Sequence, residues 1–275
     1  MKIKLIADGW KEEERKIERW GISFLLGEDI LFDTFGDEKI FFSNIEKFKI
    51  DISKVKKIII SHDHWDHIAG LWKIIEKNKN VDVYICKKSR EEFKKKIYSY
   101  GVGVIEIEGS EKIEENIYTI GQMRYFSNKE ELFEQSIVIK GKEGITILTG
   151  CAHPGINIVV DYVKERFGER IYMVAGGFHL RHKNKEEIEK IASYLKLSGI
   201  EKVVPLHCTG EKGKEIFKEI FKSRFIPLKE GDHFTRVQDS RKNLKRIIYP
   251  LATHISLTYL TLQDLNGVTS SLKNI

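Results

Sequence analysis

The sequence predicts an α/β fold in which β-sheets are packed inside layers of helices. Short apolar segments bounded by glycine or charged turns dominate the start of each half of the chain, which is typical of strands and hairpins. Behind them, helical and strand patterns alternate, as expected where helices cover the outer faces of sheets. The length of 275 residues suits one large domain or two small ones.

In the first half, residues 1–35 are expected to form strands, with a hairpin turn at residues 27–29. Apolar residues at helical spacing then predict helices between further strands. Ser89 is the expected N-cap of one helix, because its hydroxyl can accept a backbone N–H. The expected elements are strands at residues 21–26, 30–33, 55–60, 81–85, 102–107 and 116–120, and helices at residues 37–48, 67–77 and 89–98.

The second half begins with another expected hairpin, whose turn is the glycine-bounded segment 141–144. Asn184 and Glu187 predict a capping box at the start of a helix, and Gly199 is expected to end it. The expected elements are strands at residues 136–140, 145–148, 171–175 and 202–206, and helices at residues 156–167, 185–197 and 211–221.

The composition is that of a globular protein with a sizeable core, since 41% of residues are hydrophobic and 32% are charged. No apolar run is long enough to span a bilayer, and the charged N-terminus does not resemble a secretory signal. Three cysteines do not suggest a disulfide framework. We therefore expect a cytoplasmic protein without a transmembrane segment.

The net charge of +6 is unevenly distributed and does not favour nucleic-acid binding. Residues 236–275 contribute +4, and the other 235 residues contribute only +2. Most lysines in residues 1–235 alternate with glutamates, as on a solvated helix face. A small-molecule substrate is therefore expected, and association into a homo-oligomer is left open.

The segment Ser61–His67 carries the clearest chemical signal, because it contains three histidines and two aspartates after an apolar strand pattern. Imidazole nitrogens and carboxylates are ligands for zinc and similar divalent ions. Side chains two apart on a strand share a face, so His62 and His64 can bind one ion. Asp66 and His67 follow as a helix pattern begins and can turn towards a second ion. The alternative is a histidine-rich surface turn.

Three later strands each end in a small-residue turn with a histidine, namely His153, His179 and His207. Strand ends are rigid platforms, and glycines let the backbone approach an ion or substrate closely. Cys151 and Cys208 lie beside two of these histidines, and are either ligands or nucleophiles, or small packed residues. His182 and His254 are interpreted as surface residues. The residues around His233 do not indicate whether it is a surface or a site residue.

These motifs resemble the metallo-β-lactamase superfamily. His62, His64, Asp66 and His67 fill its H-x-H-x-D-H motif, and Asp33 resembles the aspartate that supports the ligand loop. Segments 149–155 (TGCAHPG), 176–180 (GGFHL) and 207–210 (HCTG) are similar to one branch, the 7,8-dihydropterin-6-ylmethyl-4-(β-D-ribofuranosyl)aminobenzene 5′-phosphate synthases. The resemblance covers residues 3–235. It implies a four-layer αββα sandwich, expected over residues 1–235. Residues 236–275 depart from the family pattern, because they lack glutamate and are rich in Ser, Thr and Leu, and form a tail of uncertain structure.

The resemblance also implies two divalent metal ions, expected to be zinc. By motif, one ion takes His62, His64 and His153, and the other takes Asp66, His67 and His207. No aspartate occupies the bridging position that many members use, so Cys151, His179 or a water is left to fill it. Asp63 is expected on the opposite strand face, where it would hold a ligand histidine in one tautomer.

The implied activity is hydrolysis of a small ester or phosphoester by a metal-bound hydroxide. Asp66 would orient the nucleophile, and His179 would donate to the substrate or to the developing oxyanion. One alternative is a transferase that condenses a pterin pyrophosphate with an aromatic amine, using an aromatic slot. Phe178, Trp10, Trp20 and Trp65 are candidates for that slot, although core packing also explains them. A second alternative is an RNA-processing nuclease, and a purely structural metal site is the non-enzymatic reading.

Overall fold

The computed structural model describes residues 1–13 and 16–236, which all belong to one unit. Seven of the described strands form a first sheet, in the order β15 (His233–Thr235), β1 (Lys2–Glu13), β2 (Lys16–Leu26), β3 (Ile30–Phe32), β4 (Lys57–Ile59), β5 (Asp82–Cys86) and β6 (Gly103–Ile107). Six form a second sheet, in the order β14 (Lys202–Leu206), β13 (Ile171–Gly177), β12 (Ile145–Thr149), β11 (Ile137–Ile139), β8 (Ile117–Thr119) and β7 (Glu111–Glu114). A separate hairpin pairs β9 (Met123–Ser127) with β10 (Glu130–Glu134).

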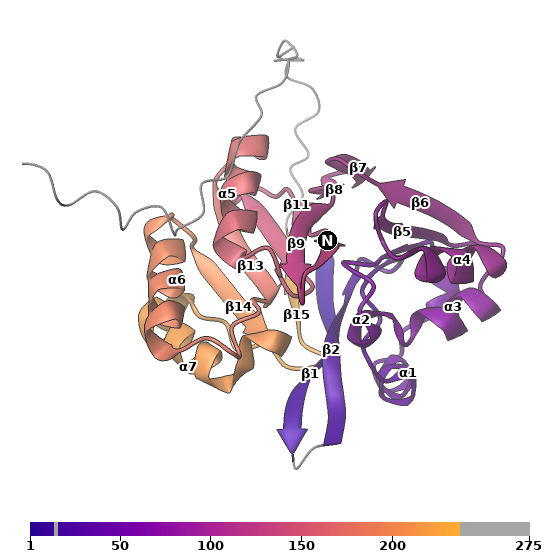
Figure 1. Cartoon of the computed structure of the whole chain (residues 1–275), viewed down its shortest axis with the longest axis horizontal. Coiled ribbons are helices and arrows are strands. Elements are labelled where there is room, and N and C mark those ends of the chain that lie inside the picture. Colours follow the sequence, from indigo (N-terminus) through magenta and orange to yellow (C-terminus); the bar gives the residue numbers. More distant parts are fainter. Residues whose placement is uncertain (14–15, 237–275) are drawn as a thin grey trace, which may run out of the picture. The chain divides into compact units, whose positions relative to one another are not determined.

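Helices lie on the outer side of each sheet, as Figure 1 shows. Those associated with the first sheet are α1 (Glu38–Lys47), α2 (Trp65–Ile68), α3 (Leu71–Lys77) and α4 (Glu91–Ser99). Those that cover the second sheet are α5 (Ile156–Phe167), α6 (Lys185–Leu197) and α7 (Gly210–Phe221). No helix in the described ranges is long and apolar enough to cross a membrane.

Three apolar cores hold these layers together. The central core joins the two sheets and contains Phe24 and Phe32 from the first and Leu148 from the second. Phe41 belongs to a core between the first sheet and its helices, and Phe217 to a core between the second sheet and its helices. Truncation of a buried phenylalanine to alanine typically costs about 3–5 kcal/mol. The order helix, sheet, sheet, helix is the predicted four-layer αββα sandwich.

Several expected elements match the structure. Helices α5 and α6 and strand β14 have the expected bounds, and the expected hairpins pair β2 with β3 and β11 with β12. The Asn184–Glu187 capping box is present, with Asn184 Oδ1 accepting from the Glu187 backbone N–H at 3.0 Å. Strands β7, β9 and β10 were not expected, because their glutamates and lysines hide the alternation of apolar residues.

Other predictions of local structure were wrong. The helix expected at 67–77 is interrupted, because the Gly70 N–H bonds to the Thr34 carbonyl at 3.1 Å instead of continuing α2. A side chain at Gly70 would meet the Phe41 ring at 2.7 Å, so glycine permits this close approach. Helix α4 begins after Arg90, and its N-cap residue is not Ser89. The strand expected at 55–60 ends at Ile59.

The expected boundary at residues 235/236 stays a prediction, because most of the tail lies outside the described residues, and His254 with it. Arg236, the first residue of the expected tail, is described and buried. Its N–H donates to the Met1 carbonyl at 2.8 Å, and its guanidinium pairs with Glu143 at 3.1 Å.

Candidate metal centre

The candidate site lies where strand ends from both sheets meet. Strands β12, β13 and β14 are parallel, so their carboxyl ends share one edge of the second sheet. Strands β3 and β4 are also parallel, and the ligand segment Ser61–His67 follows β4. Carboxyl ends of parallel strands are the usual location of sites in α/β folds. This convergence brings together residues that are far apart in the chain, such as His67 and Cys151, which are separated by 84 positions.

His62, His64 and His153 form the first group of potential ligands. Each offers a ring nitrogen, and these atoms lie within 4.8 Å of one another. The ring centroids of His62 and His64 are 4.5 Å apart, and those of His62 and His153 are 4.6 Å apart. The expectation that His62 and His64 share a strand face was wrong, because β4 ends before them. The loop nevertheless brings both side chains to the same place.

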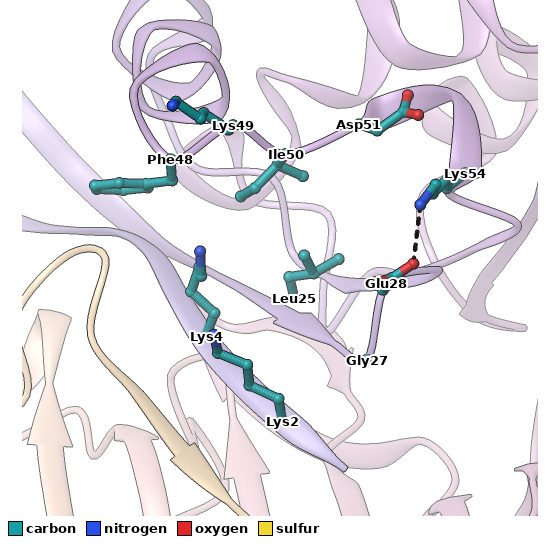
Figure 2. A pocket seen from close by; sticks show the side chains of 10 residues that line it. All are labelled: Lys2, Lys4, Leu25, Gly27, Glu28, Phe48, Lys49, Ile50, Asp51 and Lys54. Carbon is teal, nitrogen blue, oxygen red and sulfur yellow. Dashed lines mark hydrogen bonds and ion pairs between the residues drawn. The ribbon is translucent and has the colours of Figure 1, made fainter.

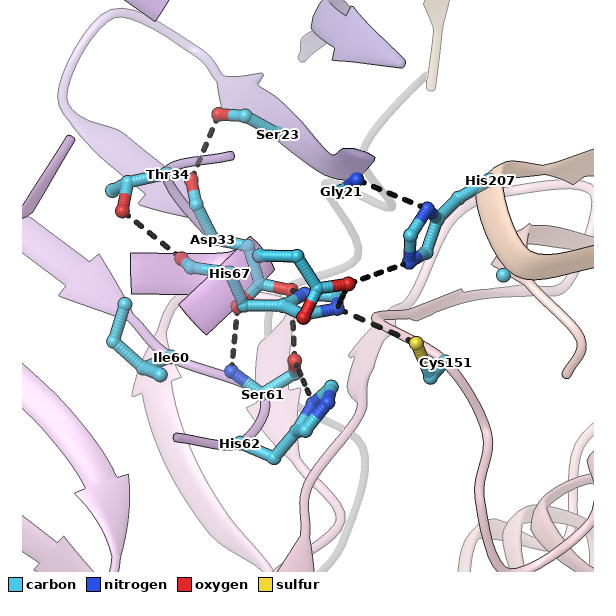
Figure 3. Close-up of polar contacts among 12 residues, drawn as sticks. Gly21, Ser23, Asp33, Thr34, Ile60, Ser61, His62, His67, Cys151 and His207 are labelled. Atoms are coloured by element: carbon cyan, nitrogen blue, oxygen red, sulfur yellow. Dashed lines mark hydrogen bonds and ion pairs between the residues drawn. The ribbon is translucent and has the colours of Figure 1, made fainter. Parts of the chain in front are cut away.

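Asp66, His67, Cys151 and His207 form the second group, and all four are buried. Asp66 Oδ2 lies 3.3 Å from His207 Nε2 and 3.4 Å from His67 Nε2. Cys151 Sγ lies 3.3 Å from His67 Nε2, as Figure 3 shows. Cys151 also forms a third group with His153 and His179. Its sulfur therefore lies at the junction of the candidate ligand sets, rather than only filling space in a core.

A glycine on β2 allows the ligand helix α2 to approach the first sheet. Gly21 has φ of +110°, and a Cβ there would lie 1.9 Å from the Asp66 carbonyl oxygen. The His67 carbonyl accepts from both the backbone N–H and the hydroxyl of Thr34, at 2.8 and 3.0 Å. A larger residue at Gly21 would push α2 away and displace Asp66 and His67.

Asp33 organises the ligand segment from beneath, as the resemblance implied. Its carboxylate accepts from the Ser61 N–H, from the Ser61 hydroxyl and from His67 Nδ1, each at 2.7 Å (Figure 3). The Ser61 oxygen is in turn 2.8 Å from His62 Nδ1. Gly150 allows this packing, because a Cβ there would lie 2.1 Å from the Ser61 hydroxyl. One buried carboxylate thus orients a histidine of each group.

Glu134, at the end of β10, has the same role on the other side of the site, and the sequence analysis missed it. Its oxygens accept from the backbone N–H groups of Cys151, Ala152 and His153, each at 2.8 Å. Oε2 is also 2.8 Å from His153 Nδ1. Burial alone would raise the pKa of Glu134, but His153 and these N–H donors lower it to about 2.

Hydrogen bonds at Nδ1 leave Nε2 available in four of the candidate histidines. His62 bonds to Ser61, His67 to Asp33, His153 to Glu134, and His207 Nδ1 lies 2.8 Å from the Gly9 carbonyl. The Gly21 N–H also points at this Nδ1, at 3.2 Å, but the contact with the Gly9 carbonyl, which can only accept, is shorter and favours a proton on Nδ1. In His64 the Tyr125 hydroxyl lies 3.5 Å from Nε2, so Nδ1 is the ring nitrogen available to a metal ion.

These residues fit divalent metal ions. The Nε2 atom of His62 is buried and has no hydrogen-bond partner within the described part of the chain, and the buried Nε2 of His207 has only the Asp66 carboxylate beside it, at 3.3 Å and without good hydrogen-bond geometry. Buried polar atoms are rarely left unsatisfied, and a metal ion would satisfy both. A histidine that binds a metal through one ring nitrogen typically hydrogen-bonds to another protein group through the other, as the Nδ1 atoms do here.

The electrostatics keep most of the cluster in the protonation state that metal binding needs. Burial holds the pKa of His62 well below its ordinary value and lowers that of His64 to about 4, so both rings are neutral near pH 7. Burial would raise the pKa of Asp66, but His67 and His207 hold it well below its ordinary value. Burial would likewise lower the pKa of His67, yet Asp66 and Asp33 raise it well above 6.5. His67 therefore retains a proton that a metal cation would replace.

The two groups open into one pocket of about 620 Å³. His179 lies in its wall at φ of +51°, with its ring centroid 4.3 Å from that of His153. Its Nδ1 is buried without a hydrogen-bond partner among the described residues, so it is available to a ligand. His182 is exposed, as expected, but also lines this pocket. The further lining residues include Trp20, Trp65, Ser127, Asn128, Arg181 and Cys208.

Two expectations about neighbouring residues need correction or refinement. Asp63 does not hold a ligand histidine, because its Oδ2 accepts from the N–H and the Nε of Arg90, at 3.0 and 2.9 Å. Asp33 and Glu134 have that role instead. Cys208 belongs to none of the ligand groups among the described residues, and its sulfur accepts the His179 N–H at 3.3 Å.

Another hollow, between the start of β1 and the loop after α1, differs from this site in chemistry. It is lined by lysines and Phe48, and Lys54 pairs with Glu28 at 3.0 Å (Figure 2). Its lining contains no histidine or cysteine. Among the described residues, the groups that could hold a metal ion lie at the edge where the strand ends meet.

Comparison with known proteins identifies the family. The sequence profile of the metallo-beta-lactamase superfamily matches residues 23–168, which include the ligand segment and His153. The chain belongs to the metallo-β-lactamase superfamily. The resemblance found in the sequence motifs is thereby confirmed, and so is the four-layer fold.

Proteins similar to this chain have different named activities. A 7,8-dihydropterin-6-methyl-4-(beta-D-ribofuranosyl)-aminobenzene-5'-phosphate synthase of Methanocaldococcus jannaschii is 29% identical, covering 77% of this chain and 88% of the relative. The solved structure of Tm1679, described as a metal-dependent hydrolase of the beta-lactamase superfamily, is 30% identical with a TM-score of 0.71, covering 87% and 100% of the two chains. Human tRNase Z, short form, has a TM-score of 0.52 at 14% identity over 75% of this chain and 92% of its own, and shares the fold alone.

Proposed function

We propose that the chain is a metal-dependent hydrolase that cleaves a small phosphoester or ester at a site for two divalent ions. The observation that carries this proposal is the pair of adjacent ligand groups that open into one pocket. A structural zinc site is usually closed by four protein ligands. Here the first group offers three histidines beside an open pocket, as a catalytic site requires.

We assign His62, His64 and His153 to one ion, and Asp66, His67 and His207 to the other. Cys151 is the proposed fourth ligand of the second ion, in place of the missing bridging aspartate. Imidazole together with thiolate favours zinc over magnesium or calcium. When bound, two zinc ions would activate water and polarise the substrate.

The protein side chains contribute orientation and charge. His67 and His207 both lie beside Oδ2 of Asp66, which leaves the other carboxylate oxygen to accept a hydrogen bond from the attacking water. His179 would donate to the substrate oxygen on which negative charge develops. Asp33 and Glu134 would keep the Nδ1 protons of His67 and His153 in place, so that both rings present Nε2.

A panel of small phosphomonoesters, phosphodiesters and carboxylic esters tests this function with the zinc-loaded protein. We expect hydrolysis of at least one class, loss of activity on chelation, and recovery when zinc is restored. His62→Ala should abolish turnover, whereas His233→Ala, an exposed position on β15, should not. Hydrolysis that persists after complete metal removal would contradict the proposal.

A second candidate is a transferase that displaces pyrophosphate from a pterin. The relative from M. jannaschii favours it, and Trp20 and Trp65 line the pocket as an aromatic slot would require. The other candidates for the slot lie elsewhere, since Phe178 is buried in a core and Trp10 lines a separate hollow. Pyrophosphate release from a pterin pyrophosphate that depends on an added aromatic amine would favour this reaction over hydrolysis. The RNA-processing alternative gains no support, because the likeness to tRNase Z concerns the fold alone.

A further inference from the structure

Arg181 occupies a defined place in the wall of the metal-ligand pocket. Its guanidinium carbon lies 4.4 Å from the centre of the Trp20 ring, in the geometry of a cation–π contact. Trp20 in turn meets the His207 ring edge-on, with centroids 5.9 Å apart. A candidate metal ligand, an aromatic ring and a guanidinium therefore contact one another in sequence in the wall of the pocket.

The backbone of Arg181 is fixed to the segment that carries His207. The Cys208 carbonyl accepts from the N–H groups of both Leu180 and Arg181, at 3.1 and 3.2 Å. Gly210 packs so closely that a Cβ there would lie 3.2 Å from the Arg181 Cβ. Because the same short segment holds His207, the backbone of Arg181 keeps a constant position relative to the second ligand group, and the Trp20 contact positions the guanidinium.

The charge of Arg181 has no carboxylate partner among the described residues, unlike that of Arg90, Arg124 and Arg170. Its Nε is buried without a hydrogen-bond partner in the same part of the chain. A buried cationic donor is costly unless it is paired. The planar guanidinium matches the oxygens of a phosphate group, to which it can donate two parallel hydrogen bonds.

We propose that Arg181, held on Trp20, is the anion-binding residue that receives a phosphate or pyrophosphate group of the substrate. The inference rests on the proposed function, because it places that group beside the metal ligands. His179 Nδ1 is a second unpartnered buried atom two residues away in the chain, so one loop presents both groups to an anion. The site would then discriminate phosphorylated substrates from neutral esters of the same size.

Pyrophosphate binding to the zinc-loaded protein, measured by calorimetry, tests the assignment without requiring turnover. Arg181→Gln should weaken binding by about 10- to 100-fold, the usual effect of losing hydrogen bonds to a charged group. Arg181→Lys keeps the positive charge but loses the two parallel N–H donors. Its affinity for pyrophosphate should therefore lie between those of Arg181→Gln and the unsubstituted protein. Arg170→Gln, at an arginine that pairs with Glu201 outside the pocket, is the matched control and should bind normally.

Zinc content and melting temperature of each variant establish that the site is intact. Where turnover is found, the KM for phosphorylated substrates should rise in Arg181→Gln by a larger factor than kcat/KM for neutral esters falls, and Arg170→Gln should change neither. Equal pyrophosphate affinity in Arg181→Gln and the unsubstituted protein, or no binding by either, would overturn the assignment. Arg181-dependent binding without hydrolysis of any ester would instead count against the proposed hydrolase alone.

Discussion

The Glu134 carboxylate lies 2.8 Å from both the ring Nδ1 and the backbone nitrogen of His153. It also accepts from the two preceding N–H groups, so it organises the whole turn that follows β12. A carboxylate with four donors is strongly favoured in its charged form. The hairpin formed by β9 and β10 thus fixes the turn that carries two candidate ligands, Cys151 and His153.

Glu134→Gln should weaken both folding and metal binding. The four groups that donate to the carboxylate would then face the NH₂ group of an amide, which cannot accept from them. The free energy of unfolding should fall by about 1–3 kcal/mol. Zinc affinity should fall by about 10- to 100-fold, as is usual when a group that hydrogen-bonds to a metal-binding histidine is lost. Glu131→Gln, on the same strand but exposed, is the control. Chemical denaturation and competitive zinc titration measure the two effects, and equal results for both variants would refute the role of Glu134.

The contribution of Glu134 to stability should depend on pH in a defined window. Its pKa is lowered to about 2 in the folded protein, from an ordinary value of 4.5. A carboxyl group with a lowered folded pKa stabilises the protein above its unfolded pKa, and that contribution disappears as the pH falls towards the folded pKa. The difference in unfolding free energy between the metal-free unsubstituted protein and Glu134→Gln should therefore shrink below about pH 4.5. A constant difference across that window would count against the prediction.

Asp33 and Asp63 should respond differently to the same substitution. Asp33→Asn alters a buried carboxylate that bonds to Ser61 and His67, so zinc affinity should fall by about 10- to 100-fold. Asp63→Asn weakens only the contact with the half-exposed Arg90 side chain and should leave zinc bound. Elemental analysis of the two purified variants compares them directly. Loss of zinc in Asp63→Asn would revive its predicted role as the partner of a ligand histidine.

Cys151 should give a spectroscopic signature that the other two cysteines do not. In the cobalt-substituted protein, a thiolate ligand produces a sulfur-to-cobalt charge-transfer band in the near ultraviolet. Cys151→Ser should abolish this band and weaken zinc binding by more than the ~10–100-fold typical of a second partner. Cys86→Ser and Cys208→Ser should keep the band, because neither residue belongs to a ligand group among the described residues. A band that survives in Cys151→Ser would leave the missing bridging position to a water or to His179.

The sequence predicted the layered fold because the later helices and strands have regular periodicity and clear end signals. Asn184 and Glu187 define the start of α6, and the apolar run before His207 corresponds to β14. The interruption at Gly70 was not predictable, since it depends on contacts with Thr34 and Phe41 that only the fold brings close.

The candidate ligands were predictable because they cluster in one motif or follow apolar strands. Their supporting residues were not, because Glu134 resembles any other glutamate in a charged segment. The turn residues Asn128 and Lys129, both with positive φ, were the available signal for its hairpin. The role proposed for Arg181 depends on its position over Trp20, which their separation in the chain conceals. The cytoplasmic location and the role of the tail stay predictions.

The metal content of protein purified without added metal tests the central claim most directly. Elemental analysis should find about two zinc or other divalent ions per chain, as expected for a dinuclear hydrolase. His62→Ala should lose an ion from the first group and His207→Ala an ion from the second, whereas His233→Ala should retain both. One ion per chain, or none, in protein with an intact fold would contradict the two-ion site and the hydrolysis proposed from it.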